Sequence, residues 1–312
     1  VTFSPDGKYF IVTDRYGTNT RIWETTTGNE IYQMTQGYEV SDFSSDGKYI
    51  VSCESTISRV MDPLTGQEIS RLTTHDNSYQ TIAKFSPDNK YVASGGCDQR
   101  GDEVPCPKGM VIIWDVTTGR IISSMSYDDG AVNLITFSPD GKHILAASNS
   151  SALVWETITG KIIARIPYNG DISKGNFTSD GNSIILVTSV VESNNKTNST
   201  ARIWNIPTRN EIANFSYVGR VNSMSFSMDG KYFVAGGCNR FTGIFCFQST
   251  AKIWDLSSKQ IISSQESVSP YYFFQNSVIF SPDKNFAAFS DGSLVIVWKP
   301  NTGDEVIRIH HS

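Results

Sequence analysis

The amino-acid sequence predicts an all-β fold, a seven-bladed β-propeller built from four-stranded antiparallel blades. A motif of the form Phe-Ser-Pro-Asp-Gly-Lys recurs seven times in the 312 residues, and its copies begin 40, 42, 52, 40, 49 and 54 residues apart. Each copy is accompanied by four short apolar runs that are separated by turn residues. A repeat of about 40 to 50 residues with four short strands is the period of a propeller blade.

The first half of each repeat is a tight turn between two strands. Proline presets φ at the first central position, aspartate bonds to nearby backbone, and glycine accepts the left-handed conformation that closes the hairpin. Asn89 is able to fill that last position in the third copy, whereas Lys284 fits it poorly and predicts a different turn in the seventh. The copies begin at Phe3, Phe43, Phe85, Phe137, Phe177, Phe226 and Phe280.

The second half of each repeat is a strand that ends in tryptophan, followed by a second turn. Six units carry the tryptophan, and Met61 takes its place in the second unit. The glycine of the second turn is present in five units and is replaced by Arg209 and Lys259 in the other two. The tryptophans are Trp23, Trp114, Trp155, Trp204, Trp254 and Trp298.

Together, the two half-motifs resemble the WD-repeat β-propeller family, and the resemblance covers the whole chain. It implies a protein-interaction module or scaffold without catalytic activity. The Gly-His pair that the family usually carries before the inner strand is nearly absent, and His75 is the one clear internal match. We therefore expect most blades to lack the family's buried Asp-His-Ser-Trp hydrogen-bond set and to depend on apolar packing between sheets.

The repeats predict a single domain over residues 1–312. The expected blades are roughly 1–40, 41–80, 81–130, 131–171, 172–219, 220–273 and 274–312. Val1 falls inside an expected strand, and the chain stops where a further unit would follow. We therefore expect an excerpt of a longer protein, tethered to other domains.

Composition and motifs restrict the function. The net charge is −5 and no run of Lys or Arg exceeds two residues, which argues against nucleic-acid binding. No apolar run approaches the roughly 20 residues that a membrane-spanning helix needs. Phosphate-binding, zinc-protease and nucleophile-elbow motifs are absent from the sequence, and its four histidines are scattered. The interpretation is a protein that is not an enzyme and has no cofactor and no metal site.

Extra residues lie between the second and third strands of three units, at 97–109, 190–199 and 238–250, and in a connector at 266–277. In a four-stranded meander these connections emerge at the same end of the sheets, so one face is elaborated. We expect a protein or peptide partner, of unknown identity, to dock on that face. Aromatic side chains there are candidates for the contact, and the alternative is that they pack on one another as a small lid core. The candidates are Phe241, Phe245, Tyr271, Tyr272 and Phe273.

Four of the five cysteines form two similar pairs, each opened by Gly-Gly-Cys. The parallel predicts two disulfides within loops, Cys97–Cys106 and Cys238–Cys246, with Cys53 as a buried thiol. Free thiols and a shared four-cysteine metal site are the alternatives. The metal site would require cysteines of the third and sixth units, which stand far apart in a seven-bladed ring, to reach one ion. Bridges favour an extracytoplasmic location; the cytoplasm is the alternative, because the family is mostly intracellular.

Two further functions stay open. Arg100 and Asp102 belong to an Arg-Gly-Asp sequence at the tip of the first cysteine loop, which is compatible with an extracellular adhesive domain. A propeller can also bind or convert a small ligand at the mouth of its channel. Five Asn-X-Ser/Thr sequons matter only if the chain enters a secretory route. They begin at Asn149, Asn176, Asn195, Asn198 and Asn214.

Overall fold

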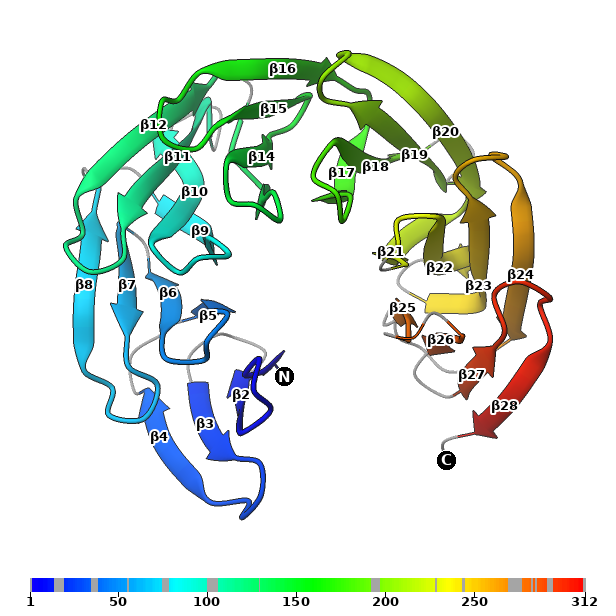
Figure 1. Cartoon of the computed structure of the whole chain (residues 1–312), viewed down its shortest axis with the longest axis horizontal. Helices are drawn as coiled ribbons and strands as arrows, with labels where there is room; N and C mark the ends of the chain where they lie inside the picture. The colour runs from blue at the N-terminus through cyan, green and yellow to red at the C-terminus, as the bar shows by residue number, and fades with distance from the viewer. Residues whose placement is uncertain are drawn as a thin grey trace. The chain divides into compact units, whose positions relative to one another are not determined.

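The computed structural model describes residues 2–13, 20–34, 39–54, 56–74, 79–99, 106–128, 130–191, 197–227, 229–242, 245–268, 277–281, 283, 285–290 and 294–310. Within these ranges the chain has 28 β-strands and no helix. The strands form seven four-stranded antiparallel sheets, as the sequence predicts. The sheets fall into two compact units, with four sheets in residues 1–167 and three in residues 168–312 (Figure 1).

The strands of the first unit follow the chain order within each sheet. They are β1 (Thr2–Phe3), β2 (Tyr9–Thr13), β3 (Thr20–Glu24), β4 (Glu30–Met34), β5 (Glu39–Phe43), β6 (Ile50–Glu54), β7 (Ile57–Met61), β8 (Glu68–Thr73), β9 (Tyr79–Phe85), β10 (Tyr91–Gln99), β11 (Lys108–Asp115), β12 (Ile121–Tyr127), β13 (Leu134–Phe137), β14 (His143–Ala147), β15 (Ser151–Glu156) and β16 (Ile162–Pro167).

The strands of the second unit do the same. They are β17 (Asp171–Phe177), β18 (Ser183–Val191), β19 (Thr197–Asn205), β20 (Asn210–Val218), β21 (Arg220–Phe226), β22 (Tyr232–Thr242), β23 (Phe245–Asp255), β24 (Ile261–Val268), β25 (Ser277–Phe280), β26 (Ala287–Ser290), β27 (Leu294–Trp298) and β28 (Glu305–His310).

The first turn of each repeat closes through a hydroxyl–aspartate pair, with serine in six repeats and Thr178 in the fifth. In the fourth sheet the Ser138 hydroxyl donates to Asp140 Oδ1 at 2.7 Å, and the Lys142 amide donates to the same oxygen at 3.1 Å. The His143 amide then donates to Ser138 Oγ at 3.0 Å, which fixes the start of β14. The Ser-X-Asp residues of the motif therefore form a hydrogen-bonded turn.

These bonds predict a loss of stability in acid. The Ser138 hydroxyl and the Lys142 amide hold the pKa of Asp140 below its usual value, and the Ser4 hydroxyl lowers the pKa of Asp6 to about 2. A carboxyl whose pKa is lower in the folded state stabilises that state above its unfolded pKa of about 3.9, and the contribution is lost as pH falls through the folded pKa. Urea unfolding should therefore show a free energy of unfolding that decreases between pH 4 and pH 2. Asp140→Asn should reduce this decrease, and an unchanged pH profile in that variant would contradict the assignment.

Within the described ranges, three residues other than glycine hold left-handed turn positions. Asn89, Arg209 and Lys259 have φ angles of 59°, 58° and 60°. The sequence predicted these positions, because each residue stands where the other units carry a turn glycine. The turns thus keep their backbone shape without glycine.

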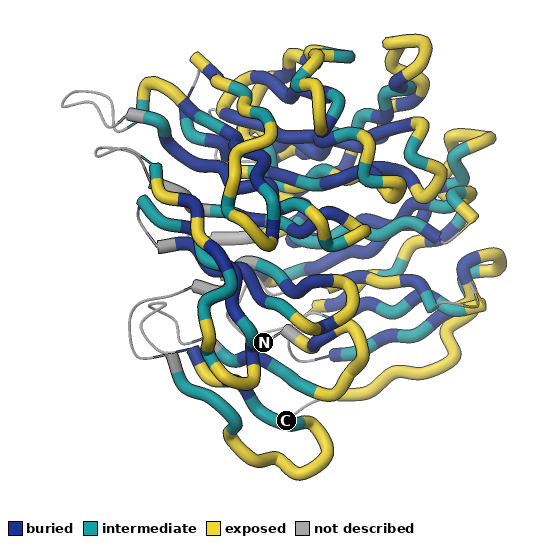
Figure 2. Tube along the Cα trace, turned by 60° about the vertical axis from the view of Figure 1, so that its left-hand side comes forward, coloured by how far each residue is buried: buried dark blue, intermediate teal, exposed yellow. Residues whose placement is uncertain are grey.

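Apolar side chains pack between consecutive sheets within each unit. Trp114 lies fully buried in one cluster with Val51 of the second sheet and Phe85 of its own. In the second unit Trp254 packs on Phe215 of the preceding sheet, with ring centroids 5.6 Å apart. Figure 2 shows buried strand centres and exposed turns. Met61, which replaces a tryptophan, is also buried.

The tryptophans differ in their hydrogen bonding. Trp114 Nε1 donates to Ser94 Oγ at 2.9 Å, whereas Nε1 of Trp155, Trp204 and Trp298 is buried and has no acceptor within the described ranges. Ser94 lies two residues beyond Val92, the strand partner of Trp114. The corresponding position beside Trp155 is Ala146.

Replacing Ala146 by serine should therefore stabilise the fourth sheet. The new hydroxyl would lie where Ser94 lies in the third sheet and would accept the bond from Trp155 Nε1. One such bond contributes about 0.5–1.5 kcal/mol to the free energy of unfolding. Denaturant titration of the Ala146→Ser variant measures it, with Ala146→Val as the control that adds volume without an acceptor. A loss of stability in the serine variant would show that the site has no room for the hydroxyl.

Candidate docking face

Each sheet has two ends, which are formed by different turns. We call the end with the turn between the second and third strands the hairpin end, and the end with the other two turns of the sheet the turn end. Three sheets have long strands at the hairpin end, formed by the pairs β10–β11, β18–β19 and β22–β23. The fourth strand also finishes at this end, since Val268 pairs with Gln248 near the tip of β23.

Two of the insertions, at 190–199 and 238–250, continue the strands on either side, whereas the sequence suggested loops. The ladder between β22 and β23 runs from Tyr232 opposite Asp255 to Thr242 opposite Phe245, with bulges after Cys238 and Arg240. Strands β18 and β19 stay paired up to Val191 and Thr197. Pairing satisfies backbone groups that an irregular loop would leave to water. The amino-acid sequence of these segments did not predict this strand pairing.

Both predicted disulfides are formed, and each one ties the two strands of an extended hairpin together. The Cα atoms are 5.8 Å apart in Cys97–Cys106 and 5.9 Å apart in Cys238–Cys246. Cys53 is a buried thiol outside both disulfides, also as predicted.

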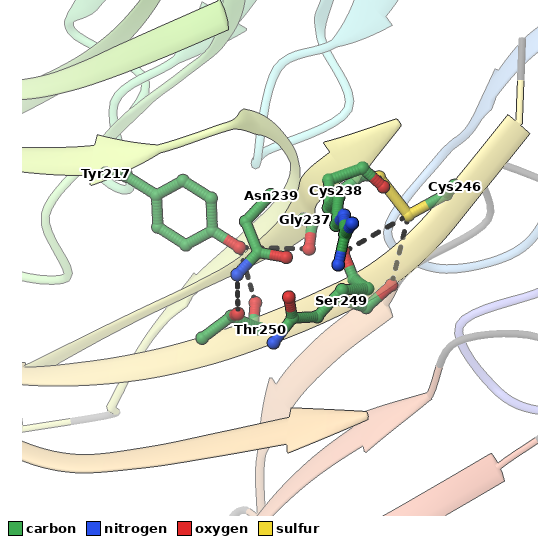
Figure 3. Close-up of a disulfide and its surroundings, with 9 residues drawn as sticks. Tyr217, Gly237, Cys238, Asn239, Cys246, Ser249 and Thr250 are labelled. Atoms are coloured by element: carbon green, nitrogen blue, oxygen red, sulfur yellow. Dashed lines mark hydrogen bonds between the residues drawn. A yellow bond between two sulfur atoms is a disulfide. The ribbon is translucent and has the colours of Figure 1, made fainter. Parts of the chain in front are cut away.

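Tyr217 of β20 anchors the second bridged hairpin from the neighbouring sheet (Figure 3). Its hydroxyl lies 2.9 Å from the carbonyl oxygen of Gly237 in β22 and 2.6 Å from that of Thr250 in β23. Asn239 Nδ2 donates to Thr250 Oγ1 at 2.6 Å on the same hairpin. Burial raises the pKa of Tyr217, so its hydroxyl stays protonated and able to donate.

Glycines allow the close approach around this anchor. A Cβ on Gly237 would lie 2.0 Å from the Arg220 carbonyl oxygen, and one on Gly219, whose φ is 106°, would lie 2.1 Å from the Cys238 carbonyl oxygen. In the first unit Tyr127 donates to the Ala146 carbonyl in a similar way. A tyrosine followed within three residues by glycine is the sequence signal of these anchors, and sequence reasoning missed it.

The candidate partner-binding residues are only partly described. Phe241 and Phe245 lie at the tip of β22 and β23, and their side chains fall outside the described part. Arg100, Asp102 and the segment with Tyr271, Tyr272 and Phe273 lie outside the described residues altogether. Their role stays a prediction.

Exposed valines mark the hairpin end of the second unit. Val191 of β18, Val218 of β20 and Val268 of β24 are 63%, 64% and 80% exposed, and Phe247 of β23 is also exposed. Sequence reasoning missed the valines, because single valines at strand ends give no signal.

The turn end of the second unit holds a cavity of about 310 Å³ between its first two sheets. Ile203, Ala213 and Leu256 form its apolar wall, and Asp180 lies at its edge. The Thr178 hydroxyl donates to Asp180 at 2.6 Å and keeps its pKa below the usual value. An ionised carboxylate that is held in a turn is a poor general acid or base near neutral pH.

The described ranges contain no group of three or more His, Cys, Asp or Glu residues that could hold a metal ion. No helix there has the length and apolar character needed to cross a membrane.

Comparison with known proteins gives family and fold matches. Residues 97–253 match the family model "NWD2 C-terminal beta-propeller", and residues 66–100 match "WD domain, G-beta repeat". A solved structure titled "Crystal structure of the eukaryotic initiation factor" superposes with a TM-score of 0.68 at 16% identity, and covers 99% of this chain and 77% of that one. At this identity the likeness shows the fold alone.

Two curated relatives align with parts of the chain. WD repeat-containing protein 82 of Drosophila melanogaster is 32% identical over 110 residues, which is 34% of this chain and 31% of that protein. Retinoblastoma-binding-like protein E of Dictyostelium discoideum is 33% identical over 81 residues, 24% of this chain and 15% of that protein. The chain thus spans less than a third of the length of either relative.

Proposed function

Because the chain belongs to the WD-repeat β-propeller family, we propose that it is a noncatalytic docking module that binds a protein partner at the hairpin end of its sheets. The observation that carries this proposal is the construction of that end. Three hairpins are extended there, and two of them are closed by disulfides. A loop that is already ordered loses little entropy when a partner binds.

The tyrosine anchor adds to this support. Tyr217 holds the β22–β23 hairpin by two carbonyl oxygens, and Gly237 lets the neighbouring backbone approach. The hairpin is therefore fixed at its base, while Phe247 and Val268 remain exposed beside it. A rigid base with exposed apolar residues suits binding of a preformed surface or peptide.

Site-specific photo-crosslinking tests which end binds. A benzophenone side chain is placed at Phe247 or Val268 of the hairpin end, and at the exposed residues Ser258 and Asn301 of the turn end as matched controls. Irradiation in cells of the source organism should give one protein adduct, shared by the two hairpin-end positions and absent from the controls. A shared adduct from the turn-end positions alone would contradict the proposal.

The aromatic candidates are tested separately. Replacing both Tyr272 and Phe273 by serine should abolish the adduct formed from Val268 and leave the melting temperature nearly unchanged, because the side chains would contact the partner. Differential scanning calorimetry provides the control. If melting collapses instead, these aromatic residues form a lid core, and the docking role passes to other residues of the hairpin end.

The bridged hairpins also favour a second candidate, an extracellular adhesive domain. Both disulfides suit an oxidising compartment. In this function Arg100 and Asp102 would contact a cell-surface receptor. Adhesion of cells to the immobilised chain, compared with Arg100→Ala and Asp102→Ala, tests it, and equal adhesion to all three proteins would reject it.

A further inference from the structure

The fifth sheet, β17 to β20, carries exposed sequons, and we propose that Asn198 and Asn214 are N-glycosylation sites. The disulfides indicate the compartment in which the chain folds. Bridges between buried cysteines, such as Cys238–Cys246, form and persist in oxidising compartments, which include the secretory route. In that route Asn-X-Ser/Thr is the acceptor sequence for N-linked oligosaccharide.

Asn214 projects into solvent from the outermost strand of its sheet. Strand β20 alternates strictly, with Ala213, Phe215 and Tyr217 buried and the residues between them exposed. Asn214 Nδ2 donates to the exposed Glu211 Oε1 at 2.9 Å. A glycosylated amide nitrogen keeps one hydrogen, so attachment of a sugar does not require this bond to be lost.

Asn198 lies on the same face of the sheet near the hairpin end. It pairs with Val218 on one side and with Val190 on the other, so the three residues form one row across β18, β19 and β20. Both valines are exposed, as is Asn198. A glycan at Asn198 would lie beside Val190 and Val218 of the fifth sheet, whereas Phe247 and Val268, the positions used to test docking, belong to the sixth sheet.

Two other described sequons are placed less favourably. The amide of Asn149 packs on Gly130, where an added Cβ would lie only 2.1 Å from Asn149 Nδ2. The nitrogen that would carry the sugar therefore faces backbone. Asn176 lies on β17, and its Oδ1 accepts a bond from the Phe177 amide at 2.9 Å, which holds the side-chain amide against the backbone.

The modification is a group transfer without oxidation or reduction. The donor is an oligosaccharide that a pyrophosphate links to a membrane lipid, and a host oligosaccharyltransferase acts on it. Asparagine Nδ2 forms a bond to C1 of the first sugar, the bond from C1 to the pyrophosphate oxygen breaks, and the lipid pyrophosphate leaves with the electron pair. One amide proton is lost to a base.

Mass spectrometry of the full chain, secreted from a eukaryotic host, tests the proposal. Peptide N-glycosidase in H₂¹⁸O converts each glycosylated asparagine to labelled aspartate, which locates the sites. We expect label at Asn198 and Asn214. The N198Q and N214Q variants should each lose the mass of one glycan, whereas N149Q and N176Q should lose none.

Two further variants separate loss of the acceptor from failure to fold. Thr200→Ala and Ser216→Ala keep the asparagines and remove the sequons, so they should lose the same glycans as N198Q and N214Q. Non-reducing mass analysis confirms that the secreted chain carries both disulfides. A secreted, bridged chain with the mass of the bare polypeptide would overturn the proposal, and so would label confined to Asn149, Asn176 or Asn195.

Discussion

Replacing Trp114 by alanine is expected to lower the free energy of unfolding by about 3–5 kcal/mol, the usual cost of removing a buried aromatic side chain. Trp114 has no exposed surface and packs with Phe85 and Val92 of its own sheet and Val51 of the preceding one. The deletion therefore opens a cavity between two sheets, which the paired strands cannot close by relaxing. Urea unfolding followed by far-ultraviolet circular dichroism measures the change.

Two controls separate the contributions to this effect. Ser94→Ala removes only the acceptor of the Trp114 Nε1 bond and should cost about 1–3 kcal/mol, because the donor is left buried and unpaired. Trp204→Ala should cost less than Trp114→Ala, since Trp204 is partly exposed and its Nε1 has no acceptor in the described part. A loss below about 1 kcal/mol for Trp114→Ala would mean that packing between sheets does not depend on this residue.

The turns and the sheet number could be predicted from the sequence because they are local. Ser138 and Asp140 bond within five residues, and the left-handed positions of Arg209 and Lys259 follow from the repeat. The disulfide pairs were predictable for the same reason, since the two cysteines of each pair are only nine and eight residues apart.

The tyrosine anchors and the extended ladders could not be predicted, because they depend on neighbouring sheets. Tyr217 bonds to residues 20 and 33 positions away in the chain, which lie on the next sheet. The repeat motif does not indicate how closely that sheet approaches Tyr217. Strand β19 begins in a polar segment whose letters are also typical of a loop. Pairing with β18 and β20 makes it a strand. Tertiary context decides such segments.

Removal of the Cys238–Cys246 bridge is expected to lower the free energy of unfolding by about 2–3 kcal/mol, the value of the chain-entropy model for a loop of this length. The double variant Cys238→Ser and Cys246→Ser is compared with Cys53→Ala, which removes a buried thiol but no bridge. The double variant Cys97→Ser and Cys106→Ser should lower the free energy of unfolding by a similar amount, because the loop that its bridge closes is only one residue longer.

The same variants show where the bridge acts. Tyr217 still holds the base of the hairpin through Gly237 and Thr250, so the loss of order should be confined to residues beyond the bridge. Hydrogen exchange should become faster for the amide of Arg240, which lies within the loop that the bridge closes, whereas those of Ile253 and Val234 stay protected. A reducing agent also breaks Cys97–Cys106, so it should lower the free energy of unfolding of the unmodified chain about twice as much as that of the double variant, and should leave a variant without all four bridged cysteines unchanged. If reduction leaves the unfolding midpoint of the unmodified chain where it was, the bridge does not stabilise the hairpin, and the stiffness of the docking face depends on the tyrosine anchor alone.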